Sequence, residues 1–351
     1  MRAWEKNFRK VEPYVPGEQP VFDKMIKLNT NECPYPPTPM IREAMEGLES
    51  DRFRLYPDFK STSLVEALAE YYGLKEEQVF VGVGSDDVLS VAFLTFFNSE
   101  KPILFPDITY SFYDVWADVY RIPYECPALD DNFRIRKEDY YKENGGIVIA
   151  NPNAPTSIAE GLEFIEDILK HNQESVVIVD EAYVDFGATS AIALLEKYEN
   201  LLVVQTFSKS RAMAGMRIGY AMGHPSLIQA MNDVKYSINS YTMNYPALQY
   251  GVCAVKDDAY FKECCGKIIA TREKVAKELE ELGFTCLPSS ANFLFASHKS
   301  VPAKEIFAAL REQNIFVRYF NKPRIDNYLR ITIGTEEQMQ IFIDFLKDYL
   351  G

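Results

Sequence analysis

Several features that indicate a metal, a membrane or a nucleic acid are scarce in this sequence of 351 residues. Only three histidines occur, and the six cysteines form neither a CxxC pair nor a cluster with histidine, so we expect no metal site. No apolar run approaches the ~20 residues that span a bilayer, and the N-terminus does not resemble a secretory signal. A net charge of −14 without a basic stripe argues against nucleic acid or an anionic membrane as a partner. We therefore expect a compact cytoplasmic protein with reduced, buried thiols.

The first two thirds of the chain alternate short apolar runs with helical segments. Runs of this kind are typical of strands that are buried on both faces of a parallel sheet. They are VFVGV (79–83), KPILF (101–105), GIVIA (146–150), SVVIVD (175–180) and LLVVQT (201–206). The alternation predicts a doubly wound α/β domain with a large, mostly parallel sheet.

The pattern changes near Tyr245, where amphipathic helices and mixed strands predict a smaller α+β domain. We place the large, cofactor-binding domain at residues 30–245. Residues 1–29 and 246–351 form an N-terminal arm plus the smaller domain. Thr335 and Gln338 are spaced as a capping box for the last helix.

Polar side chains interrupt the apolar runs where two of the predicted strands end. SVVIVD ends on Asp180, with Tyr183 three residues later, and LLVVQT leads into Ser208 and Lys209. Arg217 follows eight residues after that lysine. The carboxyl ends of strands in an open α/β sheet line the ligand crevice, so we expect these side chains to converge. Taken singly, each has a plainer explanation as a turn former, a surface lysine or an arginine paired with an acid.

Together these side chains match what pyridoxal phosphate requires. That cofactor needs a lysine amine for a covalent bond and an acid beside its ring nitrogen. Its phosphate favours hydroxyls, a guanidinium and free backbone N–H groups. Ser85 and Asp86 begin a predicted helix after a glycine-rich bend, and this helix start offers such N–H groups. The third glycine of a dinucleotide fingerprint would fall at Asp87, which disfavours a nicotinamide dehydrogenase.

The motif TFSKSRAMAGMRIG resembles the lysine motif of the fold-type I pyridoxal-phosphate aminotransferases, and VDEAYVDF and NPNAPTS are similar to two further motifs of that family. LNTNECPYPP, YPD, GSDDVL, DITYSFY and YLRITIGT resemble the histidinol-phosphate aminotransferases within it. The resemblance extends from about Tyr14 to the C-terminus. It implies the fold-type I architecture, pyridoxal 5'-phosphate as cofactor and a homodimer. It also implies the transamination of histidinol phosphate with 2-oxoglutarate to imidazole-acetol phosphate and glutamate, in histidine biosynthesis.

The resemblance also implies roles for individual residues. Lys209 would bond to the cofactor and move the proton, Asp180 would pair with the pyridine nitrogen, and Tyr183 would contact the ring hydroxyl. Further cofactor contacts would come from Tyr110, which stacks on the ring, from Asn153, from Ser85, Asp86, Ser208 and Arg217 at the phosphate, and from Tyr56 across a dimer interface. The substrate would meet Tyr14, Asn31, Arg318 and Arg330, with Arg330 on its phosphate.

Two positions depart from the family's pattern. The asparagine that usually precedes PT is Ala154 here, and the usual glycine after PT is Ser157. Either Asn153 takes over the contact to the ring hydroxyl, or Tyr183 acts more nearly alone.

Three other functions remain open. A threonine-phosphate decarboxylase or an aromatic amino acid aminotransferase of the same family would share the fold, the cofactor and most site residues. A non-catalytic regulator built on the same domain would need a DNA-binding module ahead of it, and the acidic charge disfavours DNA.

Overall fold

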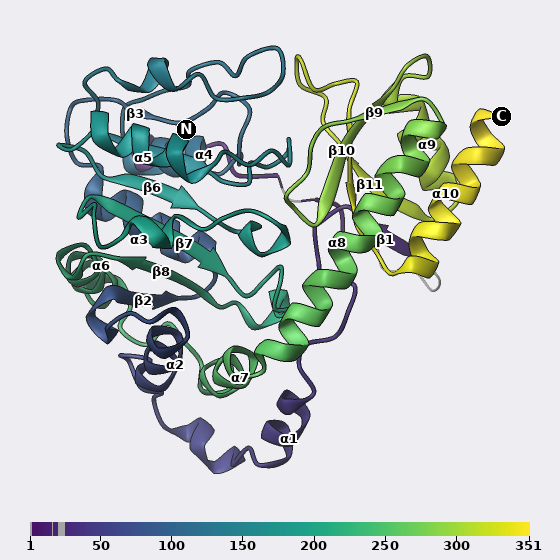
Figure 1. The fold of residues 1–351 in the computed structure, drawn as a ribbon. Coiled ribbons are helices and arrows are strands. Elements are labelled where there is room, and N and C mark those ends of the chain that lie inside the picture. The colour runs from purple at the N-terminus through teal and green to yellow at the C-terminus, as the bar shows by residue number, and fades with distance from the viewer. Residues whose placement is uncertain (1, 16, 20–24) are drawn as a thin grey trace.

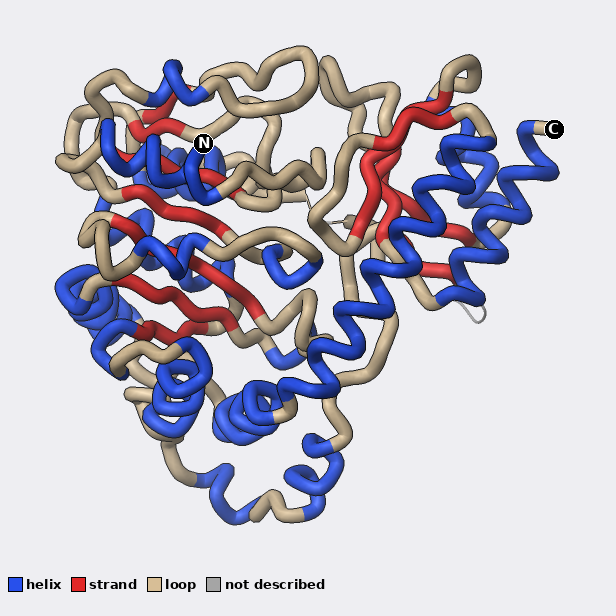
Figure 2. The backbone as a smooth tube through the Cα atoms, viewed as in Figure 1, coloured by secondary structure: helices blue, strands red, loops and turns tan. Residues whose placement is uncertain are grey.

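The computed structural model describes residues 2–15, 17–19 and 25–351, which form two parts joined by a long helix (Figure 1). The larger part contains a seven-stranded sheet and the smaller part a five-stranded sheet. Figure 2 shows the two groups of strands lying apart, with helix α8 (Asp258–Glu281) running from the larger part to the smaller one.

The larger sheet has the strand order β2-β8-β7-β6-β5-β3-β4. Its neighbouring strands are parallel except in the two pairs that β8 makes, so the predicted mostly parallel sheet is confirmed. Every residue of the three central strands is buried, because helices cover both faces of the sheet. The strands are β2 Val79–Gly82, β3 Ile103–Leu104, β4 Tyr124–Glu125, β5 Gly146–Ala150, β6 Val177–Asp180, β7 Leu201–Thr206 and β8 Gly219–Gly223.

Two apolar cores lie between this sheet and its helices. One core is filled from α2 (Thr62–Tyr72), α5 (Leu162–His171) and α7 (Tyr245–Lys256), and α1 (Met40–Glu46) lies beside α7. The other core is filled from α3 (Ser85–Phe96), α4 (Tyr113–Tyr120) and α6 (Pro225–Ile238). This is the three-layer arrangement of a doubly wound domain, and it leaves the carboxyl ends of the parallel strands free to form a site.

The smaller sheet has the strand order β1-β11-β12-β10-β9. Its strands are β1 Ile26–Leu28, β9 Phe284–Cys286, β10 Phe293–His298, β11 Ile315–Tyr319 and β12 Leu329–Thr332. Apolar side chains of α8, α9 (Ala303–Glu312) and α10 (Glu336–Leu350) pack against the sheet in a separate core. The predicted capping box is confirmed, since the Gln338 N–H donates to Thr335 Oγ1 at 3.2 Å and the Thr335 N–H donates to Gln338 Oε1 at 2.9 Å.

Strand β8 is an element that the sequence analysis missed. Its sequence GYAMG is rich in glycine and alanine, which have little preference for strands. The glycine is required by close packing, because a Cβ atom on Gly219 would lie 2.3 Å from the backbone nitrogen of Ser85. The small residue therefore lets β8 approach the start of α3.

The division of the chain into two domains at residue 245 stays a prediction. Helix α7, which that division assigns to the smaller domain, buries Ala247, Leu248 and Ala254 in the core of the larger sheet. We therefore propose Asp257, between α7 and α8, as the better boundary.

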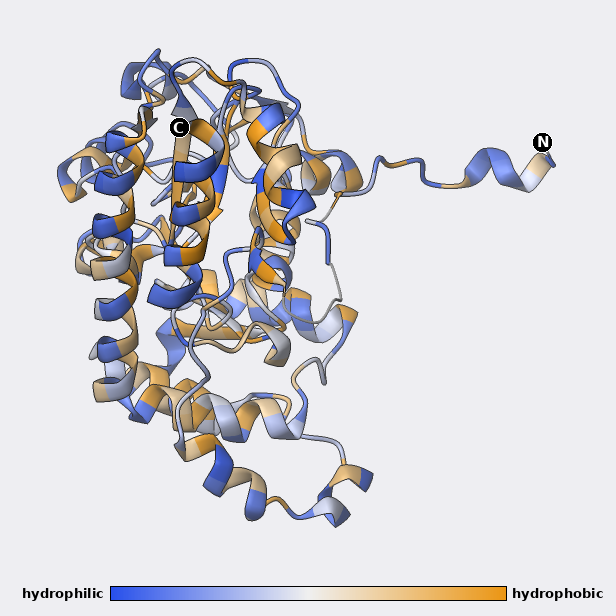
Figure 3. Ribbon diagram, turned by 90° about the vertical axis from the view of Figure 1, so that its right-hand side faces the viewer, coloured by the Kyte–Doolittle hydropathy of each residue, from blue (hydrophilic) through white to orange (hydrophobic). Residues whose placement is uncertain are grey.

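The first few described residues of the N-terminal arm extend away from the rest of the molecule in Figure 3. Its short 3₁₀ helix at Ala3–Asn7 has no buried residue, and Trp4 and Phe8 are exposed. Further along, β1 pairs in parallel with β11, so the end of the arm belongs to the smaller sheet.

All six cysteines are free. Cys264 and Cys265 are buried, but Cys126 is exposed, so the prediction of uniformly buried thiols is wrong at that position. Its strand-end location near β4 at the edge of the sheet explains the exposure. Within the described part of the chain, no helix is both long and apolar enough to cross a membrane.

Candidate active site

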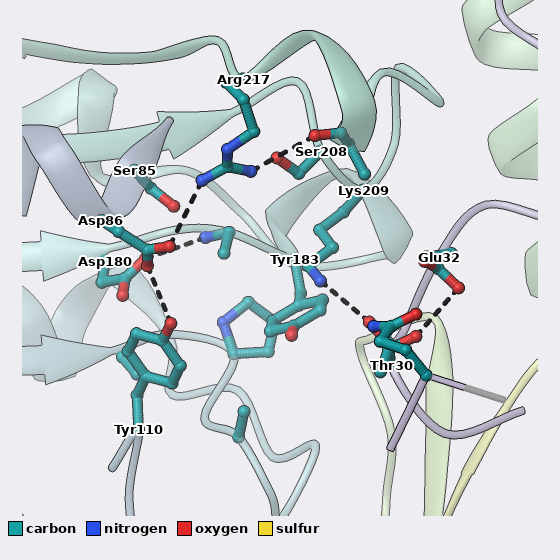
Figure 4. Close-up of a pocket in the computed structure, with 16 residues that line it drawn as sticks. Thr30, Glu32, Ser85, Asp86, Tyr110, Asp180, Tyr183, Ser208, Lys209 and Arg217 are labelled. Carbon is teal, nitrogen blue, oxygen red and sulfur yellow. Dashed lines mark hydrogen bonds and ion pairs between the residues drawn. The ribbon is translucent and has the colours of Figure 1, made fainter. Parts of the chain in front are cut away.

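A cavity of about 230 Å³ lies at the carboxyl end of the larger sheet. Figure 4 shows side chains from several elements pointing into it. The residues that the sequence analysis placed there and that line the cavity are Ser85, Asp86, Tyr110, Asp180, Tyr183, Ser208, Lys209 and Arg217. The convergence expected from the strand ends is therefore present in the structure.

Lys209 follows β7 and directs its amino group into the cavity (Figure 4). The Nζ atom donates a hydrogen bond to the backbone carbonyl of Thr30 at 3.1 Å and lies 5.8 Å from the centre of the Tyr183 ring. The acceptor of this hydrogen bond is a neutral carbonyl, which does not cancel the charge of the amine. The arrangement suits an amine that reacts with a ligand.

Asp180 ends β6 and is only 5% exposed. Its carboxylate accepts hydrogen bonds from the Tyr113 hydroxyl at 2.8 Å and from the Ala182 N–H at 3.2 Å. Burial raises the pKa of this carboxyl group to about 6, although the hydrogen bond from Tyr113 opposes the rise. Neither hydrogen-bond partner is a cation, so the buried charge can be stabilised further by a positively charged ligand.

The start of α3 forms the polar end of the cavity. Gly84 precedes the helix with φ of +87°, and a Cβ atom there would lie 2.5 Å from Nη2 of Arg217. A glycine therefore lets the guanidinium lie against the helix start, where unpaired N–H groups and a positive dipole favour an anion. The Ser208 hydroxyl lies in the same wall, accepting a hydrogen bond from Thr206 Oγ1 at 3.0 Å.

Asp86 already occupies part of this polar end with its own carboxylate. It accepts a hydrogen bond from the Tyr110 hydroxyl at 2.8 Å and forms an ion pair with Arg217 at 3.4 Å. Burial raises the pKa of Tyr110 well above its ordinary value, so its hydroxyl remains a donor. A phosphate at this end would compete with Asp86 for Arg217.

A second cavity of about 210 Å³ adjoins the first, and Lys209, Tyr110 and Tyr183 line both. Its other walls include all four residues predicted to meet the substrate, which are Tyr14, Asn31, Arg318 and Arg330. The shared residues place the lysine between the two cavities. A ligand in one cavity can therefore meet the same amine as a ligand in the other.

Two arginines face each other in the second cavity. Arg318 on β11 and Arg330 on β12 are directly opposite in the antiparallel pair, where like charges normally repel. The Nη2 atom of Arg330 donates to the carbonyl of Asn29 at 2.9 Å, and its buried Nε has no hydrogen-bond partner. No ion pair found in the described ranges involves Arg330. Two adjacent guanidinium groups of this kind form a site for an anion.

The family model described as aminotransferase class I and II matches residues 23–346 of the chain. This chain belongs to that family.

Relatives within the aminotransferase family match over nearly the whole chain. The histidinol-phosphate aminotransferase of Lactococcus lactis subsp. cremoris is 51% identical over 348 residues, which are 99% of this chain and 98% of that protein. Histidinol-phosphate aminotransferase 1 of Hydrogenovibrio crunogenus is 52% identical over 347 residues, again 99% of this chain and 98% of the relative. The predicted membership among the histidinol-phosphate aminotransferases and the predicted class of enzyme are confirmed.

The fold is also that of a solved aminotransferase. The crystal structure of histidinol-phosphate aminotransferase from Sinorhizobium meliloti in complex with pyridoxal-5'-phosphate superposes with a TM-score of 0.85. It is 22% identical and covers 93% of this chain and 90% of that one. The predicted fold-type I architecture is confirmed.

Pyridoxal 5'-phosphate, the cofactor of this aminotransferase family, fits the residues present in the first cavity. The cavity wall contains a buried carboxylate without a cationic hydrogen-bond partner, and it also contains a helix start with an arginine and a serine. Lys209 lies in the same cavity wall. These are a partner for a protonated pyridine nitrogen, a partner for a phosphate and an amine for the aldehyde, respectively.

Asn153, in the motif NPNAPTS, was expected to contact the ring hydroxyl of the cofactor. Asn153 does not line either cavity, because its amide donates to the carbonyl of Ile108 and to Thr156 Oγ1, both at 2.9 Å, and accepts from Thr109 Oγ1 at 2.8 Å. Its amide is therefore committed to the local turn, and the geometry does not support the expected contact to the ring hydroxyl. Ala154 lines both cavities instead.

A different asparagine contacts Tyr183. Asn31 Nδ2 donates to the Tyr183 hydroxyl at 2.9 Å, and Asn31 Oδ1 accepts from Thr332 Oγ1 at 3.0 Å. The sequence analysis placed Asn31 at the substrate but missed this bond, because the two residues are 152 positions apart. Asn31 has a left-handed φ of +56°, a conformation that asparagine tolerates.

Tyr56 is a second predicted site residue that lines neither cavity. Its side chain is 81% exposed and stacks on Tyr241, with ring centres 4.5 Å apart. It does not line the first cavity of its own chain, so its predicted role requires a second subunit.

Proposed function

We propose that this aminotransferase transfers the amino group of histidinol phosphate to 2-oxoglutarate, giving imidazole-acetol phosphate and glutamate in histidine biosynthesis. The observation that carries the proposal is the position of Lys209 between a cavity suited to pyridoxal phosphate and a cavity with two facing arginines. The names and the 51–52% identity of the full-length relatives support the same substrate.

Lys209 is the residue that holds the cofactor and moves the proton. Pyridoxal phosphate, when bound, supplies the electron sink that makes loss of the substrate's Cα proton possible. Lys209 Nζ, which lines both cavities, would act as the general base that takes the proton from that carbon. A base held in place in this way contributes typically about 10²- to 10⁴-fold to the rate.

Asp180 and the polar end of the cavity orient the cofactor. The Asp180 carboxylate keeps the pyridine nitrogen protonated, and Tyr183, held by Asn31, donates to the ring hydroxyl. Arg217, Ser208 and the N–H groups at the start of α3 hold the phosphate. Ser85 and Asp86 contribute to this last site through their backbone.

The second cavity binds the substrate's phosphate. Arg330 and Arg318 lie opposite each other and hold that dianion, with Tyr14 and Asn31 beside them. The same guanidinium groups accept the carboxylate of glutamate when the second substrate enters, because a planar fork suits either oxyanion.

The enzyme acts as a cytoplasmic homodimer. Tyr56 reaches the cofactor phosphate of the neighbouring subunit from an exposed loop that carries it away from its own cavity. Sedimentation should therefore give twice the chain mass, and a monomer with full activity would contradict this part of the proposal.

The deciding experiment compares substrates of the purified enzyme loaded with pyridoxal phosphate. Histidinol phosphate with 2-oxoglutarate should give glutamate at a kcat/KM far above that with phenylalanine. Threonine phosphate should release no CO₂. Faster turnover of phenylalanine would indicate an aromatic aminotransferase, and CO₂ release from threonine phosphate would indicate a decarboxylase.

A further inference from the structure

Tyr113 contacts the site from outside the cavity. It begins α4, is fully buried, and lies three residues after Tyr110 in the segment TYSFY. Its hydroxyl lies 2.8 Å from Asp180 Oδ2, whereas Tyr113 lines neither cavity. The sequence analysis assigned no role to this residue.

The direction of the bond from Tyr113 is fixed by chemistry. An ionised carboxylate only accepts hydrogen bonds, so the phenol must donate. Burial raises the pKa of Tyr113 well above its ordinary value, and the adjacent Asp180 raises it further, so the hydroxyl keeps its proton. The Ala182 N–H donates to Oδ1 of Asp180 and the Tyr113 hydroxyl donates to Oδ2. The two donors together therefore prevent rotation of the carboxylate.

The packing around Tyr113 holds its hydroxyl in place. The ring packs edge-on against Phe105 and Tyr110, with ring centres 5.8 and 5.7 Å away, in the core beneath the cavity. A fully buried phenol has no water as an alternative partner. The hydrogen bond to Asp180 is therefore formed before any ligand enters.

The same segment holds two of the carboxylates that line the first cavity, those of Asp86 and Asp180. The Tyr110 hydroxyl donates to Asp86 and the Tyr113 hydroxyl donates to Asp180, each at 2.8 Å. Asp180 has no cation among its hydrogen-bond donors, Asp86 raises its pKa, and Lys209 lowers it. Removal of the neutral donor would shift the carboxyl group toward its protonated form, which cannot hold a pyridine nitrogen in the protonated state.

We propose that Tyr113 is a positioning residue whose hydroxyl keeps Asp180 ionised and aimed at the pyridine nitrogen of pyridoxal phosphate. The inference rests on the cofactor part of the proposed function and is independent of which amino compound is the substrate. The segment TYSFY then acts on two carboxylates of the cavity, because Tyr110 donates to Asp86 and Tyr113 donates to Asp180.

The test uses Tyr113→Phe with Tyr140→Phe as the matched control. Tyr140 is also fully buried in the larger part of the molecule, but its hydroxyl has no hydrogen-bond partner. Tyr113→Phe should weaken binding of pyridoxal phosphate to the apoenzyme by about 10- to 100-fold, the loss expected for one hydrogen bond to a charged group. The ¹⁵N resonance of the labelled pyridine nitrogen should move toward its unprotonated position. Tyr140→Phe should resemble the parent in both measurements.

A double-mutant cycle with Asp180→Asn separates positioning from a general structural role. If Tyr113 acts through Asp180, Tyr113→Phe should add little loss of cofactor affinity in the Asp180→Asn background. Equal losses in both backgrounds, or a Tyr113→Phe protein that matches Tyr140→Phe, would overturn the inference. If Tyr113→Phe does not fold, difluorotyrosine at position 113 keeps the hydroxyl as a stronger donor and should tighten cofactor binding. Unchanged affinity would then overturn the inference.

The outcome is distinguishable from failure of the proposed function. An enzyme that binds the cofactor as described but does not transaminate histidinol phosphate contradicts the proposed substrate and leaves the role of Tyr113 standing. An enzyme that transaminates histidinol phosphate while Tyr113→Phe changes nothing contradicts only the role of Tyr113.

Discussion

Each of the two adjoining cavities contains a charged side chain whose hydrogen-bond partners are neutral, and the two charges are opposite in sign. In the first, the carboxylate of Asp180 is buried and hydrogen-bonded only by neutral donors. In the second, the half-buried guanidinium of Arg330 has a buried Nε without a hydrogen-bond partner, donates to a backbone carbonyl and faces another arginine. A buried charge without an opposite charge is costly, and a protein selected only for stability would pair it or replace it.

The difference between the cavities predicts which ligand group each accepts. A cationic heterocycle lowers the free energy of the first, and an oxyanion lowers that of the second. Lys209 lines both cavities, so its amine lies between the cavity of Asp180 and the cavity of Arg330. Substitutions at the amine, at the cationic end and at the anionic end test this difference.

The largest effect is expected at the shared amine. Lys209→Ala should lower turnover of histidinol phosphate by at least about 10²- to 10⁴-fold, because the general base is lost. It should also abolish the mass increase that borohydride reduction produces when the cofactor is bonded to the chain. Lys197→Ala is the control, since that exposed lysine pairs with Glu166 on the surface. A Lys209→Ala protein that transaminates like the control would refute the assigned chemistry.

A smaller effect is expected at the cationic end of the second cavity. Arg330→Ala should lower kcat/KM for histidinol phosphate by about 10²- to 10³-fold, as expected when one partner of a buried charge pair is removed. The affinity for pyridoxal phosphate should not change. Arg311→Ala is the control, because Arg311 forms an exposed ion pair with Glu18 on the same domain. Loss of cofactor affinity in Arg330→Ala would show that the two cavities are not separate in function.

The smallest effect is expected in the stability of the apoenzyme. Burial raises the pKa of Asp180 from 3.8 to about 6, so the ionised carboxyl destabilises the fold. Asp180→Asn should therefore stabilise the apoenzyme above pH 6 by up to about 3 kcal/mol. The advantage should shrink as the pH falls from 6 to 4, because the wild-type carboxyl group then takes up a proton in the folded state.

Urea unfolding of the apoenzymes at pH 7.5 and near pH 4 measures this change in stability, and cofactor titration measures its functional cost. Asp180→Asn should bind pyridoxal phosphate more weakly than the wild type while unfolding at higher urea. A variant that is less stable than the wild type at both pH values would show that Asp180 supports the fold itself.

Regular elements and strand-end residues were predictable because each depends on local sequence. The valine-rich runs gave the central strands, and Asp180 and Lys209 followed from the positions where those runs end. Strand β8 was not predictable in this way, because its glycines serve close packing against the start of α3 and weaken the strand pattern. The packing of helix α7 in the core of the larger sheet was not predictable either, since an amphipathic pattern does not say which sheet the helix covers.

Hydrogen bonds between distant residues were the main part of the site that could not be predicted. Asn31 and Tyr183 are 152 positions apart, and Tyr113 and Asp180 are 67 positions apart. Asn153 shows the converse, because the motif suggested a site role for it whereas its amide is engaged in local hydrogen bonds. No spacing rule links residues on separate elements, and only their packing brings the polar atoms within 3 Å.

The sequence by itself determined the α/β architecture, the family and the set of side chains able to do the chemistry, because strand ends and motifs are local properties of the chain. Only the tertiary structure decided which of those side chains are buried without an opposite charge, and which distant residue supports each one. The physical reason is that desolvation and hydrogen-bond geometry arise from all the elements packed around a group.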